Sequence, residues 1–236
     1  MTDKDFAALV EAAAAPYRRS GRYAWHFARG KLRGDPVFRF LLSSGVLPSA
    51  GVLFDLGCGQ GVLMALLRAA GACHARGDWP GEWPAPPSAL KLHGVELSRR
   101  RADVAGQALD GGAVVERGDI RHAPLPACAA IVILDVLLYL DDADQRHVLA
   151  RCAAALKPGG VLVLREADSE AGLPFHVTRW AEKLACWSRG QIRQSLRYRP
   201  AREWQSLLEA AGFAVEARPM SEGTPFGNVL FVALRR

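Results

Sequence analysis

The chain contains 236 residues, of which 50% are hydrophobic and 23% are charged, a composition that is ordinary for a globular protein and excludes general disorder. This length predicts one catalytic unit with a large core. The formal charge of +6 invites a nucleic-acid interpretation, but no strand-like segment carries the interleaved aromatic residues that stack bases, so a nucleic-acid partner is not expected.

Membrane, export and metal signals are also missing from the sequence. The longest apolar stretch, residues 127–140, contains Asp135 and is too short to cross a bilayer. The N-terminus places acids first, unlike a secretory signal, and the five cysteines form no C-x-x-C pair. Cys73-His74 lacks the two further ligands that zinc needs. We therefore expect a cytoplasmic protein with reduced thiols, no membrane span and no metal.

The first fifty residues predict a helical cap or lid. Residues 3–15 are rich in alanine and predict a helix. Residues 17–31 mix aromatic side chains with arginines, which suits a helix or loop lying over a pocket. Asp35-Pro36 is a favourable helix start, with aspartate as N-cap and proline in the first helical position, so a further helix is expected up to about Ser44.

From residue 51 to residue 236, apolar strands and amphipathic helices alternate. The expected strands are 52–55, 92–95, 130–134, 161–164 and 229–234, and the expected helices are 62–70, 98–109, 142–156 and 201–211. This alternation predicts a doubly wound α/β domain whose mostly parallel sheet is covered on both faces. Two insertions interrupt it: the proline-rich residues 71–91, and residues 167–200, which contain an amphipathic helix at 175–187.

A glycine-rich turn follows the first of these strands, in the sequence Asp55-Leu56-Gly57-Cys58-Gly59-Gln60-Gly61. Glycines at such a turn let the backbone approach a ligand closely and aim helix N-terminal amides at it. Dinucleotide-binding proteins use G-x-G-x-x-G to hold a pyrophosphate, and a carboxylate two positions before the first glycine would repel that anion. The pattern therefore favours a cationic ligand.

This heptapeptide closely resembles the first motif of the class I S-adenosylmethionine-dependent methyltransferases, and similarity to that family continues through Gly118-Asp119-Ile120 and Lys157-Pro158-Gly159-Gly160. The resemblance implies a Rossmann-like, seven-stranded sheet with an antiparallel C-terminal hairpin. It implies S-adenosylmethionine as the cofactor and S-adenosylhomocysteine as the product. The interval from Asp55 to Glu96 is about twice that of the family, and the 71–91 insertion accounts for the surplus.

The resemblance also assigns cofactor contacts. Glu96 would accept hydrogen bonds from the ribose hydroxyls, and Asp119 would take the adenine amino group. Leu97 and Ile120 would lie on the two faces of the adenine, and Asp135 beneath the methionine portion. The full set of expected cofactor-binding residues is Asp55, Gly57, Cys58, Gly59, Gly61, Glu96, Leu97, Asp119, Ile120 and Asp135. Lys31 and Arg33 either meet the cofactor carboxylate or are solvated charges.

A methyltransferase of this kind can rely on positioning, but a hydroxyl acceptor usually needs a general base. The candidates for that base are Tyr139, His26 and His176. The chain lacks the Asn/Asp-Pro-Pro-aromatic tetrapeptide and the Pro-Cys nucleophile of enzymes that methylate nucleic-acid bases, because Leu134-Asp135-Val136-Leu137 occupies the relevant strand end. A small-molecule acceptor with an oxygen, carbon or carboxyl target is therefore favoured.

The second insertion leaves several interpretations open. Trp180, Leu184 and Trp187 share one helix face and either line an apolar or aromatic pocket or, as we favour, pack the insertion onto the sheet. A set of arginines could pair with an acidic substrate or a carrier-protein surface: Arg179, Arg193 and Arg197. The alternatives to a small-molecule methyltransferase are an RNA methyltransferase, a non-catalytic binding module of the same fold and, last, an aminopropyltransferase.

Overall fold

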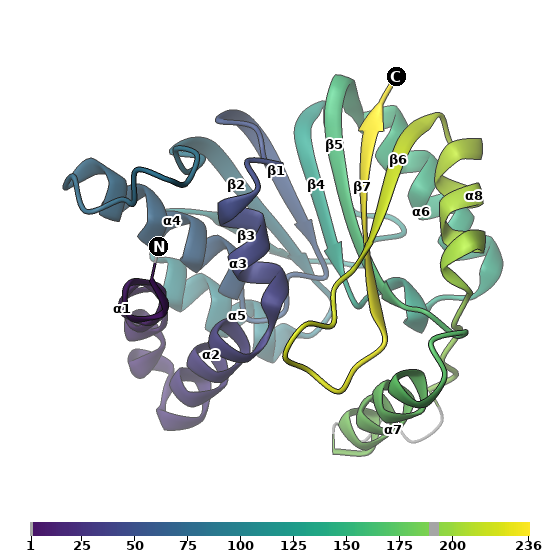
Figure 1. Ribbon diagram of the computed structural model, residues 1–236, viewed down its shortest axis with the longest axis horizontal. Coiled ribbons are helices and arrows are strands. Elements are labelled where there is room, and N and C mark those ends of the chain that lie inside the picture. Colours follow the sequence, from purple (N-terminus) through teal and green to yellow (C-terminus); the bar gives the residue numbers. More distant parts are fainter. Residues whose placement is uncertain (1, 189–193) are drawn as a thin grey trace.

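Seven strands form one mixed sheet in the order β3-β2-β1-β4-β5-β7-β6 (Figure 1). The computed structural model describes residues 2–188 and 194–236. The strands are β1 (Ala50–Leu56), β2 (Ala89–Glu96), β3 (Val114–Arg117), β4 (Cys128–Leu134), β5 (Leu156–Ala167), β6 (Phe213–Pro219) and β7 (Asn228–Arg235). All neighbours are parallel except β7, which is antiparallel to both β5 and β6. This confirms the predicted doubly wound α/β fold and its antiparallel C-terminal hairpin.

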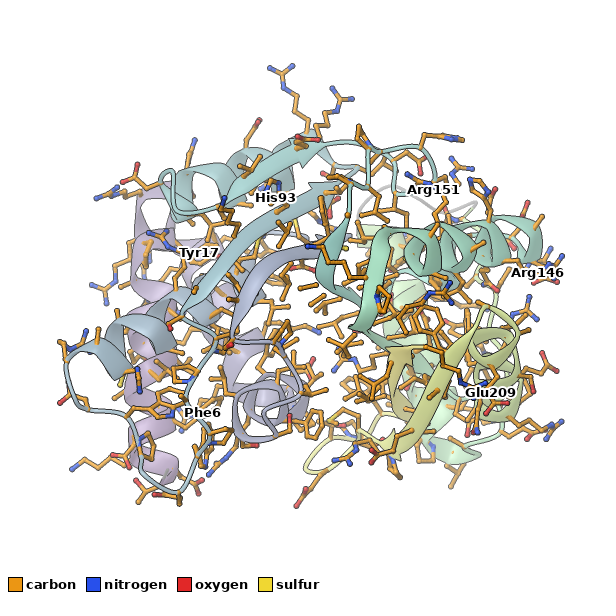
Figure 2. The ribbon with its side chains drawn as sticks, turned by 90° about the horizontal axis from the view of Figure 1, so that it is seen from above. Phe6, Tyr17, His93, Arg146, Arg151 and Glu209 are labelled. Carbon is orange, nitrogen blue, oxygen red and sulfur yellow. The ribbon has the colours of Figure 1, made fainter. Side chains whose placement is uncertain are left out.

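Helices cover both faces of the sheet, as the alternation of elements predicts. They are α1 (Asp3–Ala14), the 3-10 helix η1 (Ala15–Ser20), α2 (Arg22–Gly34), α3 (Pro36–Ser43), α4 (Val62–Ala75), α5 (Arg99–Leu109), the 3-10 helix η2 (Leu137–Tyr139), α6 (Asp142–Ala155), α7 (Leu173–Ser188) and α8 (Ala201–Ala210). Figure 2 shows the two layers, with Phe6 and Tyr17 on one side and Arg146, Arg151 and Glu209 on the other.

Two hydrophobic cores result from the alternation of side chains along the buried strands. On β4, Ala130 and Val132 face the core shared with α1 to α5, whereas Ile131 and Ile133 face the core shared with α6 and α8. Because both faces are buried, the central strands are apolar throughout their length. This explains why the unbroken run at 130–134 predicted a strand correctly.

The N-terminal helices begin where the sequence indicates. Thr2 and Asp5 form a reciprocal capping box at the start of α1. The Asp35 side chain accepts a hydrogen bond from the backbone N–H of Val37, which caps α3 as predicted. α1 and α2 pack against α4, and η1 packs against α5, so the first fifty residues belong to one of the two cores.

Several boundaries differ from the sequence expectation. β3 and β6 are implied by the seven-stranded family fold but were not among the strands located from apolar runs, since their side chains are largely exposed. α4 continues to Ala75 and β2 begins at Ala89, so the irregular part of the 71–91 insertion is the stretch between them. The expectation that Trp180, Leu184 and Trp187 pack onto the sheet is wrong, because all three side chains are exposed on α7.

The carboxyl ends of the parallel strands meet at the lower edge of the molecule in Figure 1. α2, α7 and the loop that joins β6 to β7 lie at this same edge (Figure 1). The strand order reverses between β1 and β4, and in open α/β sheets ligands bind in the crevice at such a switch point. The fold therefore places the glycine-rich turn, which follows β1, where a ligand is expected.

Candidate functional site

The glycine-rich turn lies at the switch point of the sheet. It needs glycine because its backbone is left-handed and because one of its residues packs closely against a neighbouring side chain. Gly57 has a positive φ of 79°, and an added Cβ would come within 2.5 Å of the Val136 side chain, which follows β4. At Gly59, also with a positive φ, an added Cβ would meet no atom within 4 Å. The turn is thus pressed against the end of β4 on one side and open on the other.

Two acids predicted from the sequence come together beside this turn. Asp55 is the penultimate residue of β1 and Glu96 the last residue of the neighbouring β2, and they are only 5% and 6% exposed. Glu96 accepts hydrogen bonds from the backbone N–H groups of Gly59 (2.9 Å) and Ser98 (2.8 Å). Burial, reinforced by the charge of Glu96, raises the pKa of Asp55 to about 7. A cation bound here would relieve the repulsion between the two carboxylates.

The residues of this turn fit S-adenosylmethionine, which carries one positive charge on its sulfonium sulfur and another on its amine. The buried Oε1 of Gln60 has no hydrogen-bond partner among the described residues, so an acceptor is left available. Cys58 is buried beneath the turn, and Leu97 is 64% exposed, which is unusual for leucine and provides an apolar surface next to Glu96. Acceptors for an amine and a diol therefore lie close to an apolar surface at this end of the sheet.

Asp119 and Ile120 follow β3, next to the end of β2, as their place in the motif requires. The Asp119 carboxylate receives hydrogen bonds from the backbone N–H and the guanidinium of Arg121. These hydrogen bonds lower the pKa of Asp119. Ile120 is buried in the core shared with α6. An adenine amino group would therefore have to share Asp119 with Arg121.

Asp135 is held in a different environment, a buried ion-pair cluster. Its backbone is left-handed, with φ of 59°, and its carboxylate pairs with the guanidinium of Arg165. The same guanidinium pairs with Asp35 at the start of α3, and Lys31 on α2 lies 2.9 Å from Asp35 and 3.7 Å from Asp135. Burial disfavours the charged forms, yet the neighbouring opposite charges raise the pKa of Arg165 and lower that of Asp35.

Arg165 is followed by a second buried charged residue, Glu166. Its carboxylate accepts hydrogen bonds from the backbone N–H groups of Val136 (3.2 Å) and Leu137 (2.7 Å), which fixes the turn after β4. Burial raises the pKa of Glu166 well above its ordinary value. Consecutive residues of β5 thus hold both the Asp135 side chain and the backbone that follows it.

A cavity of about 480 Å³ opens beside this ion-pair cluster, a volume that suits a drug-sized ligand. Its walls come from α2, the ends of β4 and β5, α7 and the loop between β6 and β7. The lining residues are His26, Phe27, Gly30, Lys31, Gly34, Asp35, Pro36, Asp135, Leu138, Arg165, Ala167, Thr178, Ala181, Glu182, Tyr198, Met220, Thr224, Phe226 and Asn228. Because Val136 contacts the glycine turn and Asp135 lines the cavity, the two regions adjoin.

The candidate bases occupy different positions around the cavity. His26 lines it directly. Tyr139 reaches it through Glu182, because the Tyr139 hydroxyl donates a hydrogen bond of 2.6 Å to the Glu182 carboxylate, which is part of the wall. His176 is exposed on α7, against the ring of Phe175. Of the three, the structure brings His26 and the Tyr139–Glu182 pair to the cavity.

Of the basic side chains singled out in the sequence, some lie at the site and others are exposed away from it. Lys31 belongs to the ion-pair cluster, whereas Arg33 is exposed at the end of α2. Arg179 is partly buried and Arg197 is exposed. Arg193 lies outside the described residues.

Some residues at this site were not assigned a role from the sequence. Tyr17 is fully buried and donates a hydrogen bond of 2.8 Å to the backbone carbonyl of Gln60, which ties the N-terminal segment to the glycine turn. Arg165 gave a weak signal in the sequence, because it directly follows an apolar strand core. A charged side chain that is fully buried at such a place is seldom without a partner of opposite charge. Tyr198 gave none: it lines the cavity, and its buried hydroxyl has no partner among the described residues.

Comparison with known proteins places the chain in a family. A family model described as a methyltransferase domain matches residues 24–218. Carboxy-S-adenosyl-L-methionine synthase of Chromohalobacter salexigens is 36% identical over 119 residues, which are 48% of this chain and 39% of that protein. Aclacinomycin 10-hydroxylase RdmB of Streptomyces purpurascens is 38% identical over 121 residues, 50% of this chain and 29% of that protein. The chain thus spans less than half the length of these curated relatives.

Solved structures agree on the fold. The complex between the Haloferax volcanii Trm112 methyltransferase activator and a methyltransferase contains a chain that superposes with a TM-score of 0.64. The two are 18% identical, and the match covers 92% of this chain and 96% of the other. Similarity at this level of identity speaks for the architecture and not for the substrate.

Proposed function

We propose that this chain, which belongs to the class I S-adenosylmethionine-dependent methyltransferase family, methylates a small molecule held in the cavity between α2 and α7. One observation carries the proposal: a cavity of about 480 Å³ lies at the carboxyl edge of the sheet, next to the glycine turn through Asp135 and Val136. A drug-sized acceptor fits this volume.

S-adenosylmethionine is the family's cofactor, and when bound it supplies a methyl group on a positively charged sulfur. The side chains proposed to hold it are those of the glycine turn and the two strand ends beside it. Asp55 would face the amine end, Glu96 the ribose hydroxyls, and Leu97 one face of the adenine. Asp119 and Ile120 would complete the adenine site, with Gly57, Cys58, Gly59 and Gly61 as its floor.

Asp135 keeps a role in the proposal, at the boundary between cofactor and acceptor. Because Arg165 and Lys31 together balance the charges of Asp35 and Asp135, the cluster presents a fixed, nearly neutral surface. Such a rigid floor would hold the acceptor in line with the cofactor, which is the main requirement for a displacement at carbon.

Proton removal from a hydroxyl acceptor would fall to a group in the cavity wall. Glu182 is a carboxylate in that wall and is oriented by the hydrogen bond from Tyr139, and His26 lies on the wall formed by α2. The buried hydroxyl of Tyr198 is available to bind a polar atom of the acceptor. An acceptor with an acidic hydroxyl on an apolar or aromatic body matches these groups.

Residues 1–50 are proposed to act as a cap and residues 167–200 as the opposite wall. α2 supplies the lining residues His26, Phe27 and Gly30, and α7 supplies Thr178, Ala181 and Glu182. Tyr17 couples the cap to the glycine turn. A cytoplasmic location is part of the same proposal.

A second candidate function comes from the relatives, since one is a carboxy-S-adenosyl-L-methionine synthase and the other a hydroxylase. The two relatives thus carry out different reactions, although they are 36% and 38% identical to this chain over about half of its length. The alternatives of an RNA methyltransferase or a non-catalytic binding module are weighed by the same experiment.

The experiment tests the wild type and two glycine variants for methylation of candidate acceptors. The acceptor panel consists of phenols, catechols and aromatic carboxylic acids. Gly30 lines the cavity and Gly106 lies on α5, and at both an added Cβ would meet no atom within 4 Å. Gly30→Leu should therefore block the acceptor, whereas Gly106→Leu should not, although both remove a helical glycine. S-adenosylhomocysteine release and a methylated product are measured by mass spectrometry, and S-adenosylmethionine binding by calorimetry.

The proposal predicts that Gly30→Leu abolishes turnover, keeps cofactor affinity, and differs from Gly106→Leu in turnover alone. A hydroxylated or carboxylated product would favour the relatives' chemistry. Methylation of bulk RNA with a steep dependence on salt would favour the RNA enzyme, and cofactor binding without any turnover the binding module.

A further inference from the structure

Large apolar side chains form an exposed stripe along α7. Leu173, Val177, Trp180, Leu184 and Trp187 are 81%, 42%, 72%, 63% and 65% exposed. Steps of four and three residues place them on one side of the helix, over a length of about 21 Å. They are half of the exposed large apolar side chains among the described residues, so the stripe is a patch and not a scatter of single residues.

The opposite side of α7 attaches the helix to the molecule. Phe175, Thr178 and Cys186 are buried. The Thr178 hydroxyl accepts a hydrogen bond of 3.0 Å from the backbone N–H of Gly227, and the Phe175 ring packs edge-on against Tyr198 at 5.0 Å. The helix therefore already has a packed inner face, and the stripe lies on its exposed side. α7 itself lies at the lower edge of the molecule in Figure 1.

The charges around the stripe are positive. Arg179 and Lys183 lie along the helix between the inner face and the stripe, whereas the acid Glu182 points inward to Tyr139. Within α7 itself the charged residues are the two basic Arg179 and Lys183 and the single acid Glu182. Two copies packed stripe to stripe would bring like charges together, so an anionic partner is favoured.

We propose that α7 docks this protein onto an anionic membrane surface. A basic amphipathic helix whose apolar face carries tryptophan and leucine lies in the plane of the lipid interface, with the apolar face immersed. No helix in the described part of the chain is long and apolar enough to cross a bilayer, so the contact is peripheral. The tryptophan rings match the headgroup boundary, and Arg179 and Lys183 match its negative charge.

The docked helix would lie directly beside the proposed acceptor cavity. The inner face of α7 contributes Thr178, Ala181 and Glu182 to the cavity wall, so the cavity is about one helix diameter, roughly 10 Å, from the stripe. An apolar acceptor dissolved in the membrane would reach the cavity without crossing bulk water. Membrane binding itself does not depend on the identity of the acceptor or on the proposed reaction.

The test is co-sedimentation of the full chain with phosphatidylcholine vesicles, with and without phosphatidylglycerol. We expect binding to the anionic vesicles that weakens as salt is added. Trp180→Glu with Leu184→Glu should reduce the partition coefficient at least tenfold, by roughly the cost of placing charge in the interface. Arg179→Gln with Lys183→Gln should reduce it about 25-fold at low salt.

A matched control carries the same charge change elsewhere. Val114 on β3 and Leu234 on β7 are 47% and 49% exposed, and Val114→Glu with Leu234→Glu should leave vesicle binding unchanged. Circular dichroism verifies that every variant is folded. Failure of the wild type to bind anionic vesicles overturns the proposal, as does equal binding by the stripe variant. Light scattering that shows a dimer dissociated by the stripe variant would assign the stripe to a second copy instead.

Discussion

Replacing Asp55 by asparagine should remove a pH-dependent loss of stability from the cofactor-free protein. In the folded chain the pKa of Asp55 is about 7, against 3.8 ordinarily, because the carboxyl is buried beside Glu96. The folded pKa is raised, so the native state loses stability as pH rises from about 4, and the loss is complete above about 7. At 1.36 kcal/mol per unit, the loss between pH 5 and pH 7 is about 3 kcal/mol.

The assay is urea unfolding of wild type and Asp55→Asn at pH 5 and pH 8, without cofactor. The difference in unfolding free energy should shift in favour of the variant by about 3 kcal/mol between the two pH values. Since all other titrating groups are shared, this difference isolates Asp55. Parallel stability profiles would refute the inference that the carboxylate of Asp55, near the end of β1, is buried and repelled by Glu96. Calorimetry on the same samples should show weaker cofactor binding by the variant, because a cation favours the ionised form.

Three further substitutions test the site. Arg165→Met should lower the unfolding free energy by about 3 to 5 kcal/mol, because Asp35 and Asp135 are then left with the partly exposed Lys31 as their one shared partner in the cluster, and an unchanged urea midpoint would contradict this. Glu96→Gln should weaken cofactor binding roughly 10- to 100-fold in calorimetry, as expected for hydrogen bonds to a charged group, and wild-type affinity would exclude a ribose contact. Tyr17→Phe should cost about 1 kcal/mol of stability through the lost bond to a loop carbonyl, and unfolding that matches the wild type would show that the bond contributes nothing.

The central sheet could be predicted from the sequence because its strands are buried on both faces and therefore apolar without interruption. β3 could not be predicted, since it lies at an edge, where exposed side chains such as Glu116 and Arg117 are allowed. The helix starts at Asp3 and Pro36 were predictable because their caps are local in sequence. Local chemistry fixes them before any tertiary contact is made.

In the candidate site, too, the residues that belong to a local motif could be predicted from the sequence, and those that depend on tertiary contacts could not. Asp55, the glycines and Glu96 are found by a motif, because parallel strands bring their carboxyl ends to one edge of the sheet. The pairing of Arg165 with Asp35 joins residues 130 positions apart, and no local pattern encodes it. The outward direction of the α7 stripe depends on which face packs against Tyr198, so the sequence identified the amphipathic helix but not its orientation.

The most direct test of the proposed site is a crystal structure of the chain with S-adenosylhomocysteine. We predict that the ribose hydroxyls contact the Glu96 carboxylate, that the amine end lies over the turn from Gly57 to Gly61, and that the cavity lined by His26 and Glu182 stays open for the acceptor. A ligand that fills this cavity while Glu96 keeps its bonds to Gly59 and Ser98 and faces no part of the nucleoside would contradict the assignment.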